Sequence, residues 1–397
     1  MQKNLQAEMN IGIIGHVDHG KTTLTSKLTG KWTDTHSEEI KQGISIRLGY
    51  ADCNFYKCTK CSGIQAYSAK STCSFCGSIC QLVKKVSFVD APGHETLMAV
   101  MLSGATLLNG AILVIAANED CPQPRTVEHF SAIKMYGLKN LVVAQNKIDL
   151  VSKDVAKANY KKIRDFLDSE GYNHVPIIPT SAHFDTNIDA LIYALIKYLP
   201  TPKFDTTSPL KMRVVRSFNI NKPGTLISDL KGGVLGGSII CGTVAVGDKV
   251  MLYPGINQPL ELTIESLNTD GGSLKTAVPG GLIAIGTSLD SKYTFSDRMT
   301  GQLICDSRSK PMYDNFIELE YNKIERLVES NKIELKMLEK IVLIIGTAAY
   351  AGTITKIKKS IVSVTLSKKA VFYKEDMTAV SRMVNNRWRL SGYGIIK

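Results

Sequence analysis

Residues 15–22 read Gly-His-Val-Asp-His-Gly-Lys-Thr, and they constrain the fold of this chain more than any other segment. The octapeptide matches the phosphate-binding loop pattern G-x-x-x-x-G-K-[ST]. Residues 9–14 before it are apolar enough for a buried strand, and the residues after it have helical spacing. A loop between a strand and a helix N-terminus aims several backbone N–H groups at one point, where the helix dipole favours negative charge. The pattern therefore predicts a nucleotide site.

In that site Lys21 is expected to reach the outer phosphates, and the Thr22 hydroxyl is expected to ligate Mg²⁺. The residues that we expect to contact the nucleotide in this loop are Asp18, His19, Gly20, Lys21, Thr22 and Thr23.

The order of apolar runs predicts three domains. Up to about residue 200, strand-like runs alternate with helix-like segments, which favours an α/β domain with a mostly parallel sheet and helices on both faces. A proline-rich polar linker follows, and beyond it short β-branched runs with frequent glycine predict two β-barrels. We place the nucleotide-binding domain at 1–204, with an insertion at about 53–80, and the barrels at 205–309 and 310–397.

The base that this site prefers is predicted by Asn146-Lys147-Ile148-Asp149, which follows an apolar strand. The Asp149 carboxylate can accept both the ring N–H and the exocyclic amine of guanine, and adenine offers nothing equivalent. Asn146 would brace the loops and Lys147 would cover the ring face. A site whose buried acceptors are left unpaired by the wrong base can reject that base by about four orders of magnitude. Further on, Thr180-Ser181-Ala182 could present backbone N–H groups to the guanine oxygen, and we add His183 to this set.

The segments between these motifs predict a Mg²⁺-dependent switch. Asp90 ends a strand and would hold Mg²⁺ through water, and the N–H of Gly93 would contact the terminal phosphate. In residues 43–46 the Ser45 hydroxyl could join Mg²⁺ only while that phosphate is present, unless the segment is a plain strand fragment. Order gained with one nucleotide and lost with the other is a recognised switching device. His94 could orient the attacking water, although a structural role is equally open. Together these motifs predict a P-loop GTPase.

Two Cys-x-x-Cys pairs predict a structural zinc site. Cys58 and Cys61 are separated by eleven residues from Cys73 and Cys76. Four thiolates complete a tetrahedral Zn²⁺ site and leave no open position for catalysis. The short gap favours a compact knuckle. Cys53 and Cys80 flank it, and free thiols without a metal are the alternative.

The charge balance favours a polyanionic partner. Lys and Arg outnumber Asp and Glu by 48 to 36, a formal net charge of +12, which suits RNA but also a merely solvated surface. Residues 1–9 are polar and no apolar run reaches the roughly 20 residues of a membrane span. We therefore expect a cytoplasmic protein without a membrane partner. A basic and aromatic cluster near the end of the sequence is a weaker indication of RNA contact; it contains Arg382, Arg387, Trp388, Arg389 and Tyr393.

With these motifs in place, the chain resembles the translational GTPases and, within them, the gamma subunits of the heterotrimeric initiation factor 2 of archaea and eukaryotes. The narrower resemblance rests on 43–52, the cysteine pairs and 90–95. It also rests on segments at 101–105, 116–119, 122–124, 215–218, 221–224, 230–234 and 387–390. The resemblance therefore covers nearly the whole chain.

The resemblance implies a G domain followed by two β-barrels, which carries methionylated initiator tRNA to the small ribosomal subunit while GTP is bound and hydrolyses GTP to switch off. It implies alpha and beta subunits as partners, and GTPase-activating and nucleotide-exchange partners. His94 aligns with the water-positioning histidine of the family, and Val17 and Ile44 with its apolar gate. Ser45 stands where the family usually has threonine, and the barrels are short around 263–274 and 322–346.

Three other functions remain open at this point. An elongation-type or selenocysteine-specific aminoacyl-tRNA carrier would share most motifs but has less reason to carry the four cysteines. The GTPase subunit of a sulfate-activating enzyme typically has Asp where His19 stands here. A scaffold with a degenerate G domain would not need the intact Lys21, Thr22 and Asp149.

Overall fold

A computed structural model describes residues 6–32, 49–90, 98–324, 334–385 and 387–397. The chain divides into two compact units. One is Ala7–Pro202, and the other joins Gln6 to the chain from Lys203 to Lys397.

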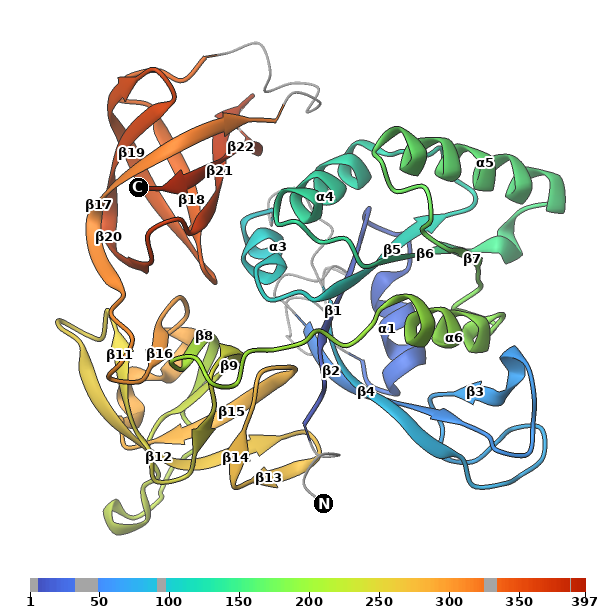
Figure 1. The fold of residues 1–397 in the computed structure, drawn as a ribbon, viewed down its shortest axis with the longest axis horizontal. Helices are drawn as coiled ribbons and strands as arrows, with labels where there is room; N and C mark the ends of the chain where they lie inside the picture. The colour runs from blue at the N-terminus through green and yellow to red at the C-terminus, as the bar shows by residue number, and fades with distance from the viewer. Residues whose placement is uncertain (1–5, 33–48, 91–97, 325–333, 386) are drawn as a thin grey trace. The chain divides into compact units, whose positions relative to one another are not determined.

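The first unit is built on a seven-stranded sheet in the order β3-β2-β4-β1-β5-β6-β7 (Figure 1). Its strands are β1 (Asn10–Gly15), β2 (Gly49–Lys57), β3 (Tyr67–Ser68), β4 (Gln81–Asp90), β5 (Gly110–Ala116), β6 (Leu141–Asn146) and β7 (Ile177–Pro179). Its helices are α1 (Lys21–Thr29), α3 (Met98–Ala105), α4 (Pro124–Met135), α5 (Lys153–Ser169) and α6 (Ile188–Tyr198), with short 3₁₀ turns η2 (Ile64–Ala66) and η4 (Ile148–Leu150).

The central strands are buried along their whole length, because helices cover both faces of the sheet. Every residue of β1, β5 and β6 is buried, and β4, β1, β5, β6 and β7 pair in parallel. In Figure 1, α3, α4 and α5 lie on one side of this sheet and α1 and α6 on the other. The expected parallel sheet with helices on both faces is therefore confirmed.

One edge of the sheet differs from a purely parallel pattern. β2 pairs antiparallel with β4, from Gly49 opposite Asp90 to Lys57 opposite Gln81, and β3 adds a short antiparallel strand. The loop that contains the four cysteines thus connects the end of β2 at Lys57 to the start of β4 at Gln81. Sequence periodicity did not reveal this, because strand direction depends on the partner.

The second unit contains two antiparallel barrels. The first is a ring of six strands in the order β11-β16-β8-β9-β15-β12, and the pairing of β11 with β12 closes the ring. In addition, β13 pairs with β12, and β10 pairs with β14. Their bounds are β8 (Lys211–Phe218), β9 (Val234–Cys241), β10 (Val244–Ala245), β11 (Lys249–Tyr253), β12 (Leu260–Thr269), β13 (Gly272–Leu274), β14 (Thr276–Ala277), β15 (Leu282–Thr287) and β16 (Leu303–Cys305). The turns η5 (Ile227–Asp229), η6 (Ser291–Tyr293) and η7 (Phe295–Asp297) lie in its loops.

The second barrel closes in the order β17-β20-β19-β18-β21-β22. Its strands are β17 (Met312–Lys323), β18 (Lys340–Ile345), β19 (Ala348–Lys358), β20 (Ile361–Phe372), β21 (Met377–Val384) and β22 (Arg387–Ile396). Each barrel has its own core of buried aliphatic side chains, so the prediction of two β-barrels is confirmed. Residues 325–333, between β17 and β18, lie outside the described part.

A buried arginine links the two barrels. Arg213 of β8 is 6% exposed; it pairs with Asp376 at 3.0 Å and donates to the Val371 carbonyl at 3.2 Å. The Thr347 hydroxyl donates to the Val214 carbonyl beside it. A buried charge that loses its partner is costly, so these contacts favour one arrangement of β8 against β20 and β21.

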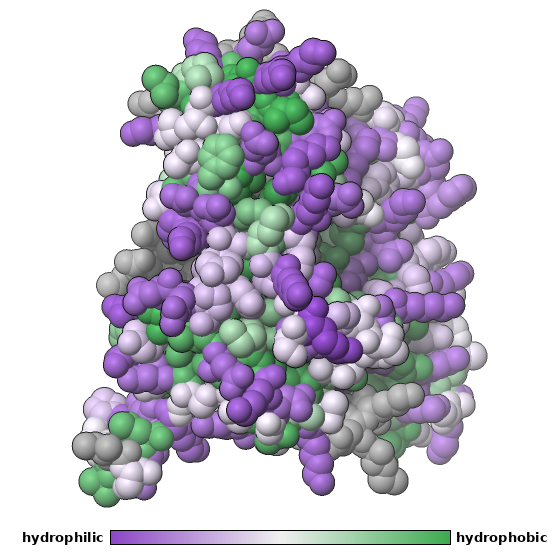
Figure 2. Space-filling model, turned by 60° about the vertical axis from the view of Figure 1, so that its left-hand side comes forward, coloured by the Kyte–Doolittle hydropathy of each residue, from purple (hydrophilic) through white to green (hydrophobic). Residues whose placement is uncertain are grey.

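On the face shown in Figure 2, hydrophilic side chains are spread among hydrophobic ones.

Candidate nucleotide-binding site and four-cysteine cluster

The predicted phosphate-binding loop connects β1 to α1 and has backbone angles that few side chains tolerate. Gly15 has φ +143°, and a Cβ there would lie 2.3 Å from the Val114 carbonyl oxygen. Asp18 and Gly20 also have positive φ, at 62° and 88°. These angles turn the chain sharply between the end of β1 and the first turn of α1. Gly15 and Gly20, the first and sixth residues of the octapeptide, are therefore required by the backbone.

Lys21 opens α1 and is 7% exposed. Its Nζ donates to the His16 carbonyl at 2.7 Å, so the side chain folds back over the loop. Thr22 and Thr23 follow in the first turn of α1 and are half-buried. The ammonium and the helix N-terminus thus lie beside the same loop, which is the charge arrangement that binds phosphate. Val17, the residue of the expected apolar gate, is half-buried in this loop.

A pair of buried histidines braces the loop from behind. The ring of His19 is fully buried; its Nδ1–H donates to the Val114 carbonyl at 2.9 Å, and its Nε2 lies 3.3 Å from the Glu119 carboxylate. Burial lowers the pKa of His19, while the Val114 carbonyl and Glu119 act in the opposite direction. The His19 ring therefore fastens the phosphate-binding loop to β5 through this hydrogen bond.

The second histidine is His129 of α4, which sequence reasoning missed. The Gly15 N–H donates to its Nδ1 at 3.2 Å, so that nitrogen must be unprotonated. Burial, together with the charges of Lys21 and Arg125, lowers the pKa of His129 to about 3. No local pattern marks His129, because it lies 114 residues from its partner.

Asn146 joins the phosphate-binding loop to the predicted guanine-binding segments. Its Nδ2 donates to the His19 carbonyl at 2.9 Å, and its Oδ1 accepts from the Ala182 N–H at 3.0 Å. It is 2% exposed and ends β6. A Cβ on Gly20 would lie 2.4 Å from its Nδ2, so the glycine also makes room for this side chain.

The other predicted base-binding residues lie close by in the chain's fold. Lys147 has φ +61°, and Asp149 is exposed in η4, with its carboxylate open to solvent. The Ile148 N–H donates to the Thr180 carbonyl at 3.3 Å, which brings the two segments together. His183 is exposed, and its ring stacks edge-on against Phe184.

The backbone groups expected to meet the guanine oxygen have partners within the protein. The Ala182 N–H donates to Asn146, and the Ser181 N–H donates to the Thr186 carbonyl at 3.2 Å. Both residues are buried. If either N–H contacts a base, it must exchange its partner, so their role stays a prediction.

The structure describes only some of the residues that we expect to bind Mg²⁺ or to form the switch. Asp90 is 1% exposed at the end of β4, opposite Ile13 of β1, and thus next to the strand that leads into the phosphate-binding loop. Ile44 and Ser45, and likewise Gly93 and His94, lie outside the described residues.

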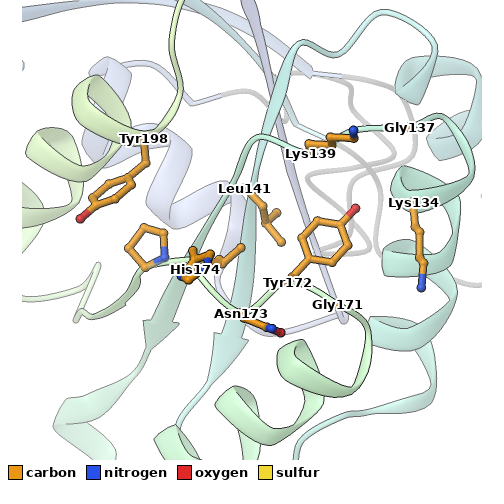
Figure 3. A pocket seen from close by; sticks show the side chains of 11 residues that line it. Lys134, Gly137, Lys139, Leu141, Gly171, Tyr172, Asn173, His174 and Tyr198 are labelled. Carbon is orange, nitrogen blue, oxygen red and sulfur yellow. The ribbon is translucent and has the colours of Figure 1, made fainter.

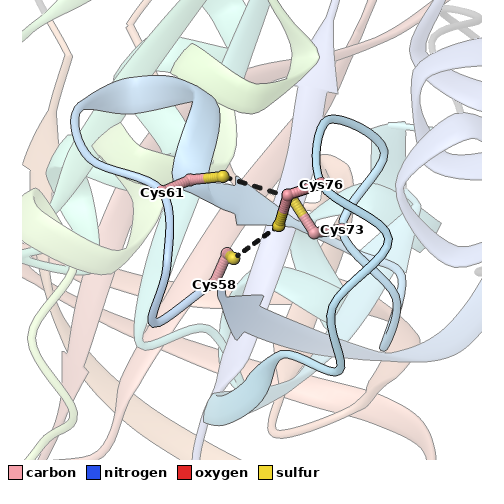
Figure 4. A group of neighbouring side chains, drawn as sticks. All are labelled: Cys58, Cys61, Cys73 and Cys76. Atoms are coloured by element: carbon pink, nitrogen blue, oxygen red, sulfur yellow. Dashed lines mark hydrogen bonds between the residues drawn. The ribbon is translucent and has the colours of Figure 1, made fainter.

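The four cysteines of the two Cys-x-x-Cys pairs converge at the tip of the insertion (Figure 4). Their sulfur atoms all lie within 4.8 Å of one another, with Cys58 to Cys76 at 3.5 Å and Cys61 to Cys73 at 3.7 Å. Tetrahedral Zn²⁺ with Zn–S bonds of about 2.3 Å requires sulfur–sulfur distances of about 3.8 Å. The donor set and its spacing therefore fit zinc.

The two flanking cysteines do not belong to this cluster. Cys53 Sγ donates to the Leu28 carbonyl at 2.8 Å in the core beside α1, and burial raises its pKa to about 12. Cys80 is buried in the same small core as Cys58 and Cys73, and burial raises its pKa, but its sulfur is not among the four that lie within 4.8 Å of one another. Within the described residues, the group that could ligate a metal consists of the four predicted cysteines.

A separate pocket of about 460 Å³ lies at the other end of the parallel strands (Figure 3). Leu141, the first residue of β6, and Val175 and Pro176, just before β7, line it, together with Tyr172 and His174. Because Asn146 ends β6, this pocket and the nucleotide loops are at opposite ends of the sheet.

Comparison with known proteins identifies the family. Residues 6–201 match the family model of the elongation factor Tu GTP binding domain, and residues 315–396 match initiation factor eIF2 gamma, C terminal. The chain is 48% identical to translation initiation factor 2 subunit gamma of Methanococcus aeolicus over 100% of both chains. It is 49% identical to the same subunit of Methanocaldococcus jannaschii, over 99% of this chain and 98% of that one. The chain belongs to the gamma-subunit family of translation initiation factor 2.

The unit Ala7–Pro202 is thus a GTP-binding domain of the elongation factor Tu type, and we call it the G unit. Among solved structures, a bacterial selenocysteine-specific elongation factor, EF-Sec, is similar with a TM-score of 0.76 and 26% identity over 98% of this chain and 58% of that one. Translation elongation factor SelB of Methanococcus maripaludis, in complex with the GTP analogue GPPNHP, has a TM-score of 0.74 at 21% identity, covering 99% and 79%. The likeness to the second shows the fold alone. None of the described helices is long and apolar enough to cross a membrane.

Proposed function

We propose that this chain carries methionylated initiator tRNA to the small ribosomal subunit while GTP is bound, as the core subunit of a heterotrimer with alpha and beta subunits. The observation that carries the proposal is the pair of hydrogen bonds through Asn146. They join the phosphate-binding loop to the predicted guanine-binding segments in a chain that is similar to initiation factor 2 gamma subunits over its whole length. These hydrogen bonds hold the two parts of the predicted nucleotide site together.

Recognition of GTP is assigned to three groups of residues. Asp149 would accept two hydrogen bonds from guanine, and its exposed position leaves it accessible to a base. Lys147 would cover the base, with Ser181, Ala182 and His183 near it. The phosphates would be bound by the backbone of Asp18, His19 and Gly20, by the ammonium of Lys21 and by the N-terminus of α1 at Thr22 and Thr23.

Mg²⁺ would be held by the hydroxyls of Thr22 and Ser45 and, through water, by Asp90. The ion would neutralise charge between the outer phosphates. Loss of the terminal phosphate would release Ser45 and the Gly93 N–H, which couples hydrolysis to the rest of the chain.

Hydrolysis would use His94 to orient the attacking water, and Val17 and Ile44 would keep His94 away until an activating partner binds. Val17 is half-buried in the phosphate-binding loop, where a gate residue must be. Nucleotide exchange would be assisted by a second partner.

The four cysteines would hold a structural Zn²⁺. All four ligand positions are filled by thiolates, so the ion would stabilise the insertion and take no part in hydrolysis. We further assign 1–204 to the G domain, including the insertion at about 53–80, and 205–309 and 310–397 to the barrels.

A second candidate function is an elongation-type or selenocysteine-specific carrier, which the likeness to EF-Sec favours. Retention of tRNA separates the two. The chain, assembled with its alpha and beta subunits, is tested with methionylated initiator tRNA and with elongator methionyl-tRNA, in the presence of a non-hydrolysable GTP analogue or GDP. We expect retention of the initiator tRNA with the analogue and much less with GDP. Equal retention of the two tRNAs would reject the initiation function.

A further inference from the structure

A basic and aromatic surface lies where the cysteine insertion meets α6. We define this knuckle–α6 surface by Lys57, Tyr67, Tyr193 and Lys197. The Tyr67 and Tyr193 rings are 5.1 Å apart; Lys57 Nζ lies 5.5 Å from the centre of the Tyr67 ring, and Lys197 Nζ lies 5.6 Å from that of Tyr193. The two rings thus lie side by side with a lysine next to each, on two chain segments that are distant in sequence, and α6 packs against β3 to bring them together.

The charge of the surrounding segment has one sign. Residues 53–89 contain five lysines and no aspartate or glutamate. Two of these lysines are used internally: Lys84 donates to the Leu199 carbonyl, and Lys85 pairs with Asp52 at 3.5 Å. The other three, Lys57, Lys60 and Lys70, are exposed.

The same place is hollowed. A cleft of about 610 Å³ is lined by Lys57, Tyr67, Gln81 and Tyr193 together with the loop that holds Cys58 and Cys61. Its volume is within the range of small-molecule sites, about 300–1,000 Å³, and admits a base with its ribose. The exposed amide of Gln81 offers both a donor and an acceptor to a base edge.

We propose that the knuckle–α6 surface binds an unpaired stretch of RNA, in addition to the tRNA carried under the proposed function. The lysines at both ends of the surface would contact phosphates, and the tyrosines would offer a face for a base. Unpaired nucleotides are favoured over a duplex because a base can enter a cleft only when it is free of its partner strand. An acidic peptide would match the lysines but would leave the ring faces and Gln81 without a counterpart.

Lys197 is well placed for such a contact. It lies at the exposed end of α6, with Nζ 5.2 Å from the centre of the Tyr198 ring as well. Hydrogen bonding to Tyr193 raises the pKa of Lys197. The surface is distinct from the nucleotide loops, none of whose predicted residues line this cleft.

The test measures binding of a fluorescent oligouridylate of twelve nucleotides to the full chain with zinc and a non-hydrolysable GTP analogue, over a series of salt concentrations. The double variant K57Q/K197Q removes both flanking charges. Its matched control, K157Q/K161Q, removes two exposed lysines of α5 on the same unit, with the same change of net charge.

We expect K57Q/K197Q to bind about tenfold more weakly and the control to change by less than about twofold. The slope of log affinity against log salt should become shallower by about 1.4, because each phosphate that a lysine no longer neutralises on a single strand reduces it by about 0.7. Tyr67→Leu, which keeps an apolar side chain against α6, should weaken binding at least about fivefold. K197Q alone, which leaves Lys57 beside Cys58 unchanged, should lower affinity about threefold and guards against an indirect effect of the Lys57 substitution on Cys58.

An equal loss of affinity in the α5 control would overturn the proposal, since attraction to net charge alone would then explain binding. So would competition by polyglutamate without competition by unlabelled oligouridylate, which indicates a protein partner. Retention of initiator tRNA by K57Q/K197Q should equal that of the unaltered chain; a parallel loss would mean that the surface belongs to tRNA carriage. Competition by unpaired and by base-paired RNA separates a strand from a duplex, and preference for the duplex contradicts the proposal.

Discussion

Replacing Asn146 with alanine should uncouple the phosphate-binding loop from the guanine-binding segments. The substitution removes the acceptor for the Ala182 N–H and the donor to the His19 carbonyl. His19 is fully buried and Ala182 is 2% exposed, so water does not readily replace the lost partner. A buried group left without a partner costs about 1–3 kcal/mol, which gives about 2–6 kcal/mol of folding stability for the two.

The nucleotide should report this loss separately from stability. If GDP binding requires one of the two hydrogen bonds made by Asn146, then Asn146→Ala should weaken GDP binding by about 1–3 kcal/mol, which corresponds to about 5- to 150-fold. The measurement is titration of a fluorescent GDP analogue in parallel with the thermal midpoint of the full chain.

Gln145 provides the control, because it is the neighbouring residue of the same strand and is 1% exposed. Its amide donates to the Ala156 carbonyl at 2.8 Å and to Asn159 Oδ1 at 2.9 Å, so Gln145→Ala also removes two buried hydrogen bonds, but toward α5 and away from the nucleotide loops. We expect the two variants to lower the thermal midpoint similarly and only Asn146→Ala to lose GDP affinity strongly. Equal affinities in the two variants would refute the bracing role of Asn146.

Three further outcomes are expected. Asp149→Asn should shift the preference from guanine toward xanthine nucleotides, because the amide donates where the carboxylate accepted; an unchanged ratio of GTP to XTP affinity would remove Asp149 from the site. Metal analysis under reducing conditions should find about one zinc per chain; Cys61→Ser should lower that content, and Cys53→Ser, whose thiol contacts the Leu28 carbonyl, should not. Stability should decrease as pH falls from about 6.5 toward 3, by up to about 1.4 kcal/mol per pH unit, because His129 stays neutral in the folded chain and takes up a proton when unfolded. In His129→Asn, whose amide oxygen can still accept from Gly15, the decrease of the thermal midpoint between pH 6.5 and 5 should be smaller; an identical pH profile would argue against a neutral buried His129.

The alternating apolar runs and the glycine-rich loop were sufficient to predict the G unit, because each feature is local. A strand such as β5 is buried over its whole length and reads as a continuous apolar run. The phosphate-binding loop needs glycine at positions 15 and 20 because of its own backbone angles, so the motif can be recognised from eight consecutive residues. The four-cysteine cluster is similar, since two Cys-x-x-Cys pairs bring four possible metal ligands within nineteen residues, from Cys58 to Cys76.

The tertiary structure decided the contacts between segments that are far apart in sequence. Asn146 meets the His19 carbonyl across 127 residues, and His129 receives the Gly15 N–H across 114. The exclusion of Cys53 from the cysteine cluster likewise depends on α1, whose Leu28 carbonyl accepts its thiol.

The amino-acid sequence by itself determined the α/β unit and the two barrels and predicted a phosphate loop and a guanine-binding loop, since hydrophobic periodicity and backbone restriction act over a few residues. Only the tertiary structure decided how the loops support one another, which strand runs antiparallel at the sheet edge, and that Arg213 pairs with Asp376. The physical reason is the same in each case. A hydrogen bond or ion pair needs two partners, and which partners meet is settled by the packing of the whole chain.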